Sequence, residues 1–125
     1  MLQTSKAFSS FSVKNIEEAK AFYESIGLKT KVGEMGLLEL ALEGNENIML
    51  YPKDNHQPAT FTVLNFPVNN IDKAVDELIS KGIKFEQYDS EYLKTDEKGI
   101  SRGEQGPKIA WFKDPSGNIL SVLEG

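Results

Sequence analysis

The chain has 125 residues, of which 39% are hydrophobic, enough for one globular domain with a buried core. Its formal net charge of −5, with no block of Lys and Arg, argues against nucleic acid as a partner. The absence of cysteine excludes disulfides and thiolate chemistry. The absence of any apolar run of about 18 residues excludes a membrane partner, and without a signal-like N-terminus the chain is expected to be cytoplasmic.

The first half of the chain reads as one βαβββ unit. Alternating residues at its start predict a strand, and Asn15 is suited to cap the helix that follows. Gly27 stands where a left-handed residue commonly ends a helix. Three shorter strand patterns come next. The predicted strands of this half cover residues 5–13, 28–33, 37–43 and 47–52.

The second half repeats the first. Residues 11–29 align with residues 66–84 at an offset of 55 without a gap, and eight of the nineteen aligned pairs are identical. Asn70 and Gly82 then take the places of the first helix cap and helix end. The predicted strands of this half cover residues 60–68, 83–88, 108–114 and 119–124. A fold of the α+β class with tandem βαβββ modules is therefore expected.

The two modules are expected to span residues 5–52 and 60–124 of a single domain, joined by a polar linker over residues 53–59. They differ in one respect. The second module has a long segment, residues 89–107, between its second and third predicted strands. A loop of that length in a compact domain is commonly functional or disordered.

The repeat, its opening pattern FxVxNIEEAxxFYxxxGL and the closing WFKDPSGNILSVLE resemble the vicinal oxygen chelate superfamily. This group includes glyoxalase I, extradiol dioxygenases, fosfomycin resistance enzymes and bleomycin resistance proteins. The resemblance covers nearly the whole chain. It implies two half-barrels around a cavity, each with its helix on the outside, and in many members a divalent metal held by His and Glu side chains. A shared fold does not fix the function.

The metal-ligand positions implied by the resemblance do not carry ligands in this chain. They fall on Phe8, Leu50, Val63 and Ser121, and moving the Leu50 alignment by one or two places brings no ligand there. One hydroxyl cannot hold a divalent ion. The sequence therefore predicts a member with no metal and no other cofactor.

Strand alternation predicts which side chains face the cavity. The expected inward residues are apolar with a few hydroxyls and an amide, as in a small-molecule pocket. Trp111 could stack on a planar ligand, and Arg102 in the 89–107 segment could bind a carboxylate or phosphate. The alternatives are a filled core and a solvated arginine. The candidate ligand-binding residues are Phe8, Ser10, Leu50, Val63, Asn65, Trp111, Ser121 and Arg102.

Two further residues bear on catalysis. Glu39, in the LLELALE strand, is a candidate for a buried base or for a partner of a cationic ligand, and it could equally lie on an exposed strand face. His56 is the only histidine, and its place in the polar linker predicts a solvent-exposed loop residue.

Three functions remain open at this point. The first is a small-molecule binding protein like the bleomycin resistance group, which sequesters a partly aromatic or cationic ligand without metal. The second is a glyoxalase- or dioxygenase-like enzyme with a non-standard site, and the third is an interaction module with a filled cavity. A homodimer, possibly with swapped halves, fits all three.

Overall fold

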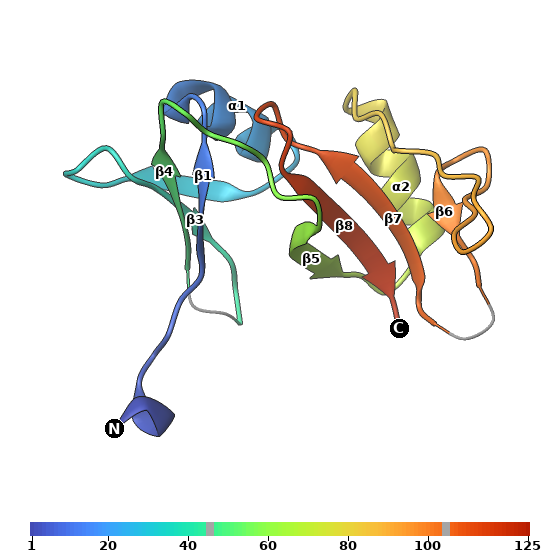
Figure 1. The fold of residues 1–125 in the computed structure, drawn as a ribbon, viewed down its shortest axis with the longest axis horizontal. Helices are drawn as coiled ribbons and strands as arrows, with labels where there is room; N and C mark the ends of the chain where they lie inside the picture. Colours follow the sequence, from blue (N-terminus) through green and yellow to red (C-terminus); the bar gives the residue numbers. More distant parts are fainter. Residues whose placement is uncertain (45–46, 104–105) are drawn as a thin grey trace. The chain divides into compact units, whose positions relative to one another are not determined.

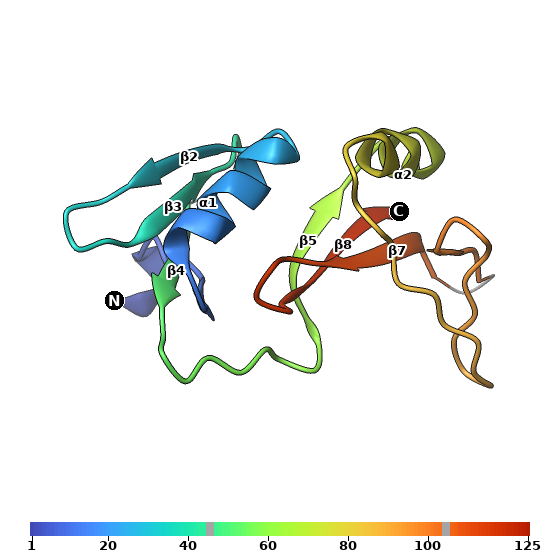
Figure 2. The same cartoon turned by 90° about the horizontal axis from the view of Figure 1, so that it is seen from above.

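A computed structural model describes residues 1–44, 47–103 and 106–125 of the protein. The chain divides into two compact units, Met1–Pro58 and Ala59–Gly125. Each unit contains one helix and one four-stranded sheet (Figure 1), and in Figure 2 the helix of each unit lies along one side of its own sheet. This tandem βαβββ arrangement confirms the α+β fold predicted from the repeat.

The sheet of unit 1 has the strand order β1-β4-β3-β2, in which β1 and β4 are parallel and the other neighbours are antiparallel. A single turn of 3-10 helix, η1, precedes it. The elements are η1 (Leu2–Thr4), β1 (Ser10–Val13), α1 (Ile16–Ser25), β2 (Lys29–Val32), β3 (Leu38–Ala41) and β4 (Ile48–Pro52). The first strand is shorter than the predicted 5–13, because its partner β4 begins only at Ile48.

The sheet of unit 2 has the equivalent order β5-β8-β7-β6, with β5 and β8 parallel. Its elements are β5 (Thr62–Pro67), α2 (Ile71–Ser80), β6 (Ile100–Ser101), β7 (Lys108–Lys113) and β8 (Ile119–Glu124). α1 and α2 have ten residues each. Within the described residues no helix is long and apolar enough to cross a membrane.

Both helices begin and end as their sequences predict. The side chains of Asn15 and Asn70 each accept a hydrogen bond from the N–H of the third helical residue, at 2.8 and 3.0 Å. These bonds satisfy one of the donors that a helix start leaves without an intrahelical partner. At the other ends, Gly27 and Gly82 adopt φ angles of 102° and 94°, which glycine reaches without strain.

The core of unit 1 lies between α1 and one face of its sheet. Val13, Leu38, Leu40 and Leu50 are fully buried there, together with Tyr23 of the helix. β2 lies at one edge of the sheet, and both of its lysines are exposed. The side chains that alternate with the buried set point to the opposite side of the sheet, which is named the open face.

The predicted strand at 83–88 is not formed, and the place beside β7 is taken by β6. Among the described residues, one backbone hydrogen bond joins the 83–88 segment to β7, from Glu86 N–H to the Trp111 carbonyl at 2.8 Å. Its apolar alternation has a different origin, since Phe85 is buried and packs edge-on against Phe112 with ring centroids 5.4 Å apart. The segment supplies core side chains without adding a strand.

The long segment after it, called the strap (residues 89–103), is ordered by local hydrogen bonds. Asp96 accepts the N–H groups of Lys98 and Ile100, both at 2.9 Å, and so forms the turn that leads into β6. Gly99 sits in this turn with φ 88°, and an added Cβ would lie 2.7 Å from the Phe85 Cβ. Residues 89–103 of the predicted 89–107 loop are therefore structured, and residues 104–105 lie outside the described part of the chain.

Candidate functional site

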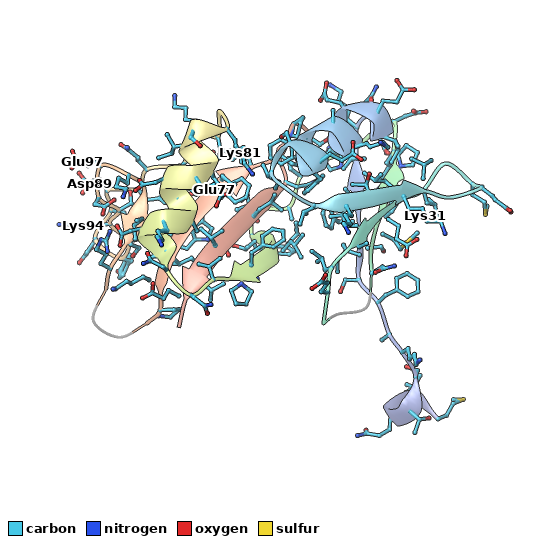
Figure 3. All side chains as sticks on the ribbon, turned by 180° about the vertical axis from the view of Figure 1, so that it is seen from behind. Lys31, Glu77, Lys81, Asp89, Lys94 and Glu97 are labelled. Atoms are coloured by element: carbon cyan, nitrogen blue, oxygen red, sulfur yellow. The ribbon has the colours of Figure 1, made fainter. Side chains whose placement is uncertain are left out.

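The open face of unit 1 is laid out by the strand register. Ser10 of β1 pairs with Met49 of β4, Met49 with Glu39 of β3, and Glu39 with Lys31 of β2. Directly paired residues project from the same face of a sheet. One row of side chains therefore crosses the whole sheet, from a hydroxyl through a thioether and a carboxylate to an ammonium group. Figure 3 labels Lys31 on the strand at the outer edge.

A cavity of about 520 Å³ lies over this face. Its size falls within the usual range for small-molecule sites. Most of its walls are apolar or aromatic, with a few polar groups among them, and the Phe8 side chain is 65% exposed at its rim. The lining residues are Phe8, Ser10, Leu37, Glu39, Asn47, Met49 and Tyr51.

The carboxylate of Glu39 is held toward β4. Asn47 donates a hydrogen bond from Nδ2 to Glu39 Oε1. Lys31 is the cross-strand neighbour of Glu39, yet among the described residues no lysine or arginine forms an ion pair with this carboxylate. Glu39 therefore presents its negative charge to the cavity from a fixed orientation.

Leu50 requires a correction. The sequence placed it toward the cavity, but it is fully buried on the α1 side of the sheet and pairs there with Phe11 and Leu38. Its neighbours Met49 and Tyr51 line the cavity in its place. The alignment of β4 with the last strand of the repeat was one residue out of phase, and a shift of one residue moves every side chain of a strand to the other face.

On the open face of unit 2, polar side chains form hydrogen bonds with one another. Ser121, fully buried, donates a hydrogen bond to Asn65 Oδ1 at 2.6 Å. Trp111 pairs with Ser121 across the ladder, and its Nε1–H donates to Thr62 Oγ1 at 3.1 Å. The ring of Tyr88 packs edge-on against Trp111 at 5.6 Å. Asn65, Ser121 and Trp111 thus share one face, as the alternation predicts.

Val63 lies at an irregularity in the pairing of β5 with β8, between Thr62 and Leu64. A bulge adds a residue and changes which side chains reach a given face. Thr62 supplies the hydroxyl that bonds to Trp111 on the open face, and Val63 is half-buried. The repeat carries no signal for this bulge, so the sequence could not reveal the role of Thr62.

Arg102 is engaged within unit 2. Its guanidinium donates to Asp72 of α2 at 2.5 Å and to Asp96 of the strap at 3.0 Å. The hydrogen bond with Asp72, followed by that with Asp96, raises the pKa of Arg102 above its ordinary value. Arg102 therefore ties the strap to the helix, and its role in binding a carboxylate or phosphate stays a prediction.

Lys98 strengthens the same tie. Its ammonium lies 2.8 Å from Asp76 and 3.4 Å from Asp72, and the bond to Asp76 is the main cause that raises the pKa of Lys98. In return, the hydrogen bond from Arg102 lowers the pKa of Asp72. In Figure 3, Asp89, Lys94 and Glu97 extend from the loop beside α2, where Glu77 and Lys81 are also labelled.

His56 is not the solvent-exposed loop residue that the sequence predicted. It is half-buried, and its Nδ1 lies 2.6 Å from the hydroxyl oxygen of Ser12 on β1. Two backbone bonds bring the segment back to the strand: Lys53 N–H donates to the Val13 carbonyl, and His56 N–H donates to the Lys53 carbonyl, both at 3.0 Å. Ser12 alternates with Ser10 and therefore belongs to the open face of unit 1.

The metal that the resemblance implies does not fit the residues present. In residues 1–44, 47–103 and 106–125, no three His, Cys, Asp or Glu side chains lie close enough together to hold a metal ion. The described lining of the unit 1 cavity offers a single carboxylate, and the open face of unit 2 offers an amide and hydroxyls already bonded to each other or to Trp111. Divalent metal sites need several imidazole, thiolate or carboxylate ligands.

Four cavity residues were missed as site residues by the sequence reasoning: Leu37, Asn47, Met49 and Tyr51. Asn47, just before β4, and Met49 and Tyr51 within it follow an alternating pattern, so a signal for them was present in the period of the strand. The sequence pattern does not show which of the alternating residues face the cavity, because the pairing of β4 with β1 decides this.

Comparison with known proteins places this architecture in a family. The family model described as Glyoxalase/Bleomycin resistance protein/Dioxygenase superfamily matches residues 8–122. A search of curated proteins gives no match.

Several solved structures share the fold at low sequence identity. A glyoxalase family protein from Bacillus anthracis is 24% identical, with a TM-score of 0.73, over 98% of this chain and 95% of that one. A fosfomycin resistance protein from Listeria monocytogenes is 14% identical, with a TM-score of 0.72, over 98% and 93%. A lactoylglutathione lyase from Agrobacterium tumefaciens is 19% identical, with a TM-score of 0.69, over 98% and 94%. Because the family model matches nearly the entire chain, the protein belongs to the glyoxalase/bleomycin resistance protein/dioxygenase superfamily.

Proposed function

We propose that the protein binds a small molecule with a partly aromatic body and a cationic group on the open face of unit 1, without a metal. The observation that carries this proposal is the cavity of about 520 Å³ in which Asn47 holds the Glu39 carboxylate. Family membership alone does not decide between binding and catalysis, because the structural neighbours include both a resistance protein and a lyase.

The walls of the cavity suit an apolar, partly aromatic body. Phe8 and Tyr51 are both exposed, at 65% and 39%, although aromatic side chains gain most from being covered. Leu37 and Met49 extend the apolar surface between them. A ligand ring that covers these side chains would remove apolar area from water, which is the main source of affinity in such sites.

The charge of the cavity favours a cation at one end of the ligand. Glu39 is the only ionisable carboxylate among the described lining residues, and no described lining residue is basic. A carboxylate already oriented by Asn47 loses little freedom when an ammonium group binds it, and the aromatic rims add attraction to the same charge. Lys31 at the neighbouring position of β2 opposes this preference and limits its size.

The proposal is tested by three probes that differ in charge: phenethylamine, 2-phenylethanol and phenylacetate. Binding is measured by saturation-transfer NMR and by titration. We expect the amine to bind about tenfold more tightly than the alcohol, a difference of about 1.4 kcal/mol, and the acid to bind most weakly. Equal affinities for the three probes would contradict the assignment of Glu39.

A pair of variants isolates the charge. Glu39→Gln keeps the shape of the side chain and should abolish the preference for the amine over the alcohol. Glu34→Gln removes the same charge from an exposed position between β2 and β3 and should leave the preference intact. A loss in both variants would mean that the overall charge of the protein, rather than the cavity, attracts the amine.

The metal-free part of the proposal has its own test. Protein incubated with Zn, Ni, Mn and Fe(II) and then desalted should retain less than about a tenth of an equivalent of each metal by plasma mass spectrometry, because the donor set is incomplete. Close to one equivalent of any metal would overturn this part and favour an enzyme of the glyoxalase or dioxygenase type.

We further propose a cytoplasmic homodimer. The chain has no cysteine, which agrees with a reducing compartment, and members of this superfamily are often dimers. Light scattering coupled to size-exclusion chromatography should give about twice the 13.9 kDa of one chain. A mass equal to one chain at all concentrations would contradict the dimer.

A further inference from the structure

We propose that Ser12 and His56 form a nucleophile–base pair that accepts an acyl group from a small activated ester held over the open face of unit 1. The hydroxyl oxygen of Ser12 lies 2.6 Å from His56 Nδ1, and both side chains are half-buried. In the imidazole tautomer that carries its proton on Nε2, Nδ1 accepts the serine proton. Nucleophile and base within hydrogen-bond distance are the geometric signature of an activated serine.

The pair is pre-organised by the backbone on both sides. Ser12 sits in the middle of the parallel ladder between β1 and β4, where it pairs with Tyr51. The chain leaves β4 after Pro52, returns to β1 through the Lys53–Val13 bond, and turns so that His56 N–H reaches the Lys53 carbonyl. The imidazole is thus placed over Ser12 by a closed turn rather than by a free loop.

The pair lies on the same sheet face as two residues that line the cavity, Ser10 and Tyr51. Ser10, which lines the cavity, and Ser12 are successive side chains on the same face of β1, about 7 Å apart along the strand. Tyr51, the ladder partner of Ser12, also lines the cavity. A ligand covering Met49 and Tyr51 can therefore bring a carbonyl group next to the Ser12 hydroxyl. The inference rests on the proposed function in this one respect, since the same cavity would hold the acyl donor.

The reaction balances with an ester and water. The Ser12 oxygen attacks the ester carbonyl, its proton passes to His56 Nδ1, and the bond between the acyl carbon and the leaving oxygen breaks. The leaving oxygen takes the proton from His56, or departs as an anion while His56 gives the proton to solvent, and in both cases the imidazole is neutral again. Water then attacks the acyl-serine with His56 as base, which releases the carboxylic acid and restores the hydroxyl. No oxidant, reductant or metal takes part.

The test uses p-nitrophenyl acetate as the acyl donor. We expect a burst of p-nitrophenolate, one acetyl group on the intact protein by mass spectrometry, and its location on Ser12 by peptide mapping. Activation by a positioned base predicts that Ser12 reacts about a hundredfold faster than the exposed Ser9 three residues earlier. Acetylation spread over lysines and the N-terminus with no label on Ser12 would overturn the proposal.

Variants separate the base from a structural role. Ser12→Ala should remove the burst, and both His56→Gln and His56→Asn should slow it by about a hundredfold, whereas Ser9→Ala should keep it. Circular dichroism and thermal unfolding identify any variant that fails to fold, and two His56 substitutions guard against that outcome. An unchanged burst in folded His56 variants would show that the imidazole is not the base.

The same samples keep this inference apart from the proposed function. Protein that binds phenethylamine but is not acetylated at Ser12 refutes the nucleophile–base pair alone. Protein that is acetylated at Ser12 but shows no preference for phenethylamine refutes the cationic ligand alone. Acetylation of Ser12 that phenethylamine inhibits competitively supports both.

Discussion

The two halves of this chain share their helix caps and their strand order, yet their open faces differ. In unit 1 Ser10 of β1 pairs with Met49 of β4, which carries a thioether, and both side chains line the cavity. In unit 2 the corresponding residues are Asn65 and Ser121, which bond to each other at 2.6 Å. The repeated helix caps therefore produce the same backbone scaffold in both units, whereas the chemistry of each open face depends on a few strand residues.

The units also differ in the segment on the C-terminal side of the helix. Unit 1 forms an antiparallel pair of strands, β2 and β3, directly after α1. Unit 2 inserts the strap, whose order depends on Asp96, Gly99 and the ion pairs of Arg102. Local hydrogen bonds and charges thus replace a regular hairpin, so the strap should depend on salt and pH more strongly than the β2–β3 pair does.

The largest expected effect comes from the two faces of β4. Leu50→Ala removes a fully buried side chain and should cost about 3 kcal/mol of unfolding free energy, with little direct effect on the cavity. Met49→Ala should cost about 1 kcal/mol and weaken phenethylamine binding. Urea denaturation and NMR titration with phenethylamine test both variants. A larger loss of stability in Met49→Ala than in Leu50→Ala would support the faces predicted from the sequence, with Leu50 toward the cavity.

The next effect concerns the strap alone. Gly99→Ala forces a Cβ against Phe85 at a positive φ and should destabilise unit 2 by about 2–3 kcal/mol. Gly103→Ala is the matched control, because nothing lies within 4 Å of its added Cβ and its φ is not positive. Amide hydrogen exchange should locate the loss of protection in unit 2. A similar loss in both variants would argue against a specific role of Gly99.

A smaller effect is expected at the bonded pair of unit 2. Ser121→Ala removes the bond to Asn65 and should cost about 1 kcal/mol, because Asn65 is exposed and can bond to water. Asn65→Ala should cost at least as much, since it leaves the Ser121 hydroxyl buried without that acceptor. Denaturation of both single variants and the double variant gives the coupling energy, and additive effects would contradict the bond.

The smallest effect is the acid response of the strap. The bond from Arg102 holds the pKa of Asp72 below its ordinary value of 3.8, so its contribution to stability is complete above that pH and is lost as the pH falls through the lowered value. Partial burial opposes the shift at Asp96, but bonds from Ile100, Arg102 and Lys98 still lower its pKa.

Asp72→Asn should therefore remove part of this acid dependence, and salt should weaken the tie in the wild type more than in the variant. Hydrogen exchange of the strap between about pH 2 and 6 measures both effects, with the core strand β4 as the internal reference. Equal exchange in the two proteins at every pH would show that the ion pair contributes nothing.

The scaffold was predictable because its signals are local. Asn15 and Asn70 cap their helices and Gly27 and Gly82 end them, since caps need only the neighbouring backbone groups. Most strands agree with their predicted ranges within two residues. In unit 2 the alternation also placed Asn65, Ser121 and Trp111 on one face.

The remaining errors arose where distant pairing decides the outcome. Leu50 and Met49 exchange faces according to the register with β1, and Val63 lies at a bulge that only the ladder with β8 reveals. The segment 83–88 has an apolar pattern because Phe85 enters the core, although β6 takes the strand position. His56 meets Ser12 across 44 residues, a proximity that no local pattern encodes.

The outer edge of each sheet has a consequence for the behaviour of the protein at high concentration. An open strand edge invites pairing with another molecule and hence aggregation. In unit 1 the edge strand β2 carries Lys29 and Lys31, whose charges would repel the same edge of a second copy. In unit 2 the edge strand β6 is two residues long and offers little to pair with. Replacing both lysines of β2 with valine should therefore promote edge-to-edge pairing of copies and the formation of fibrils.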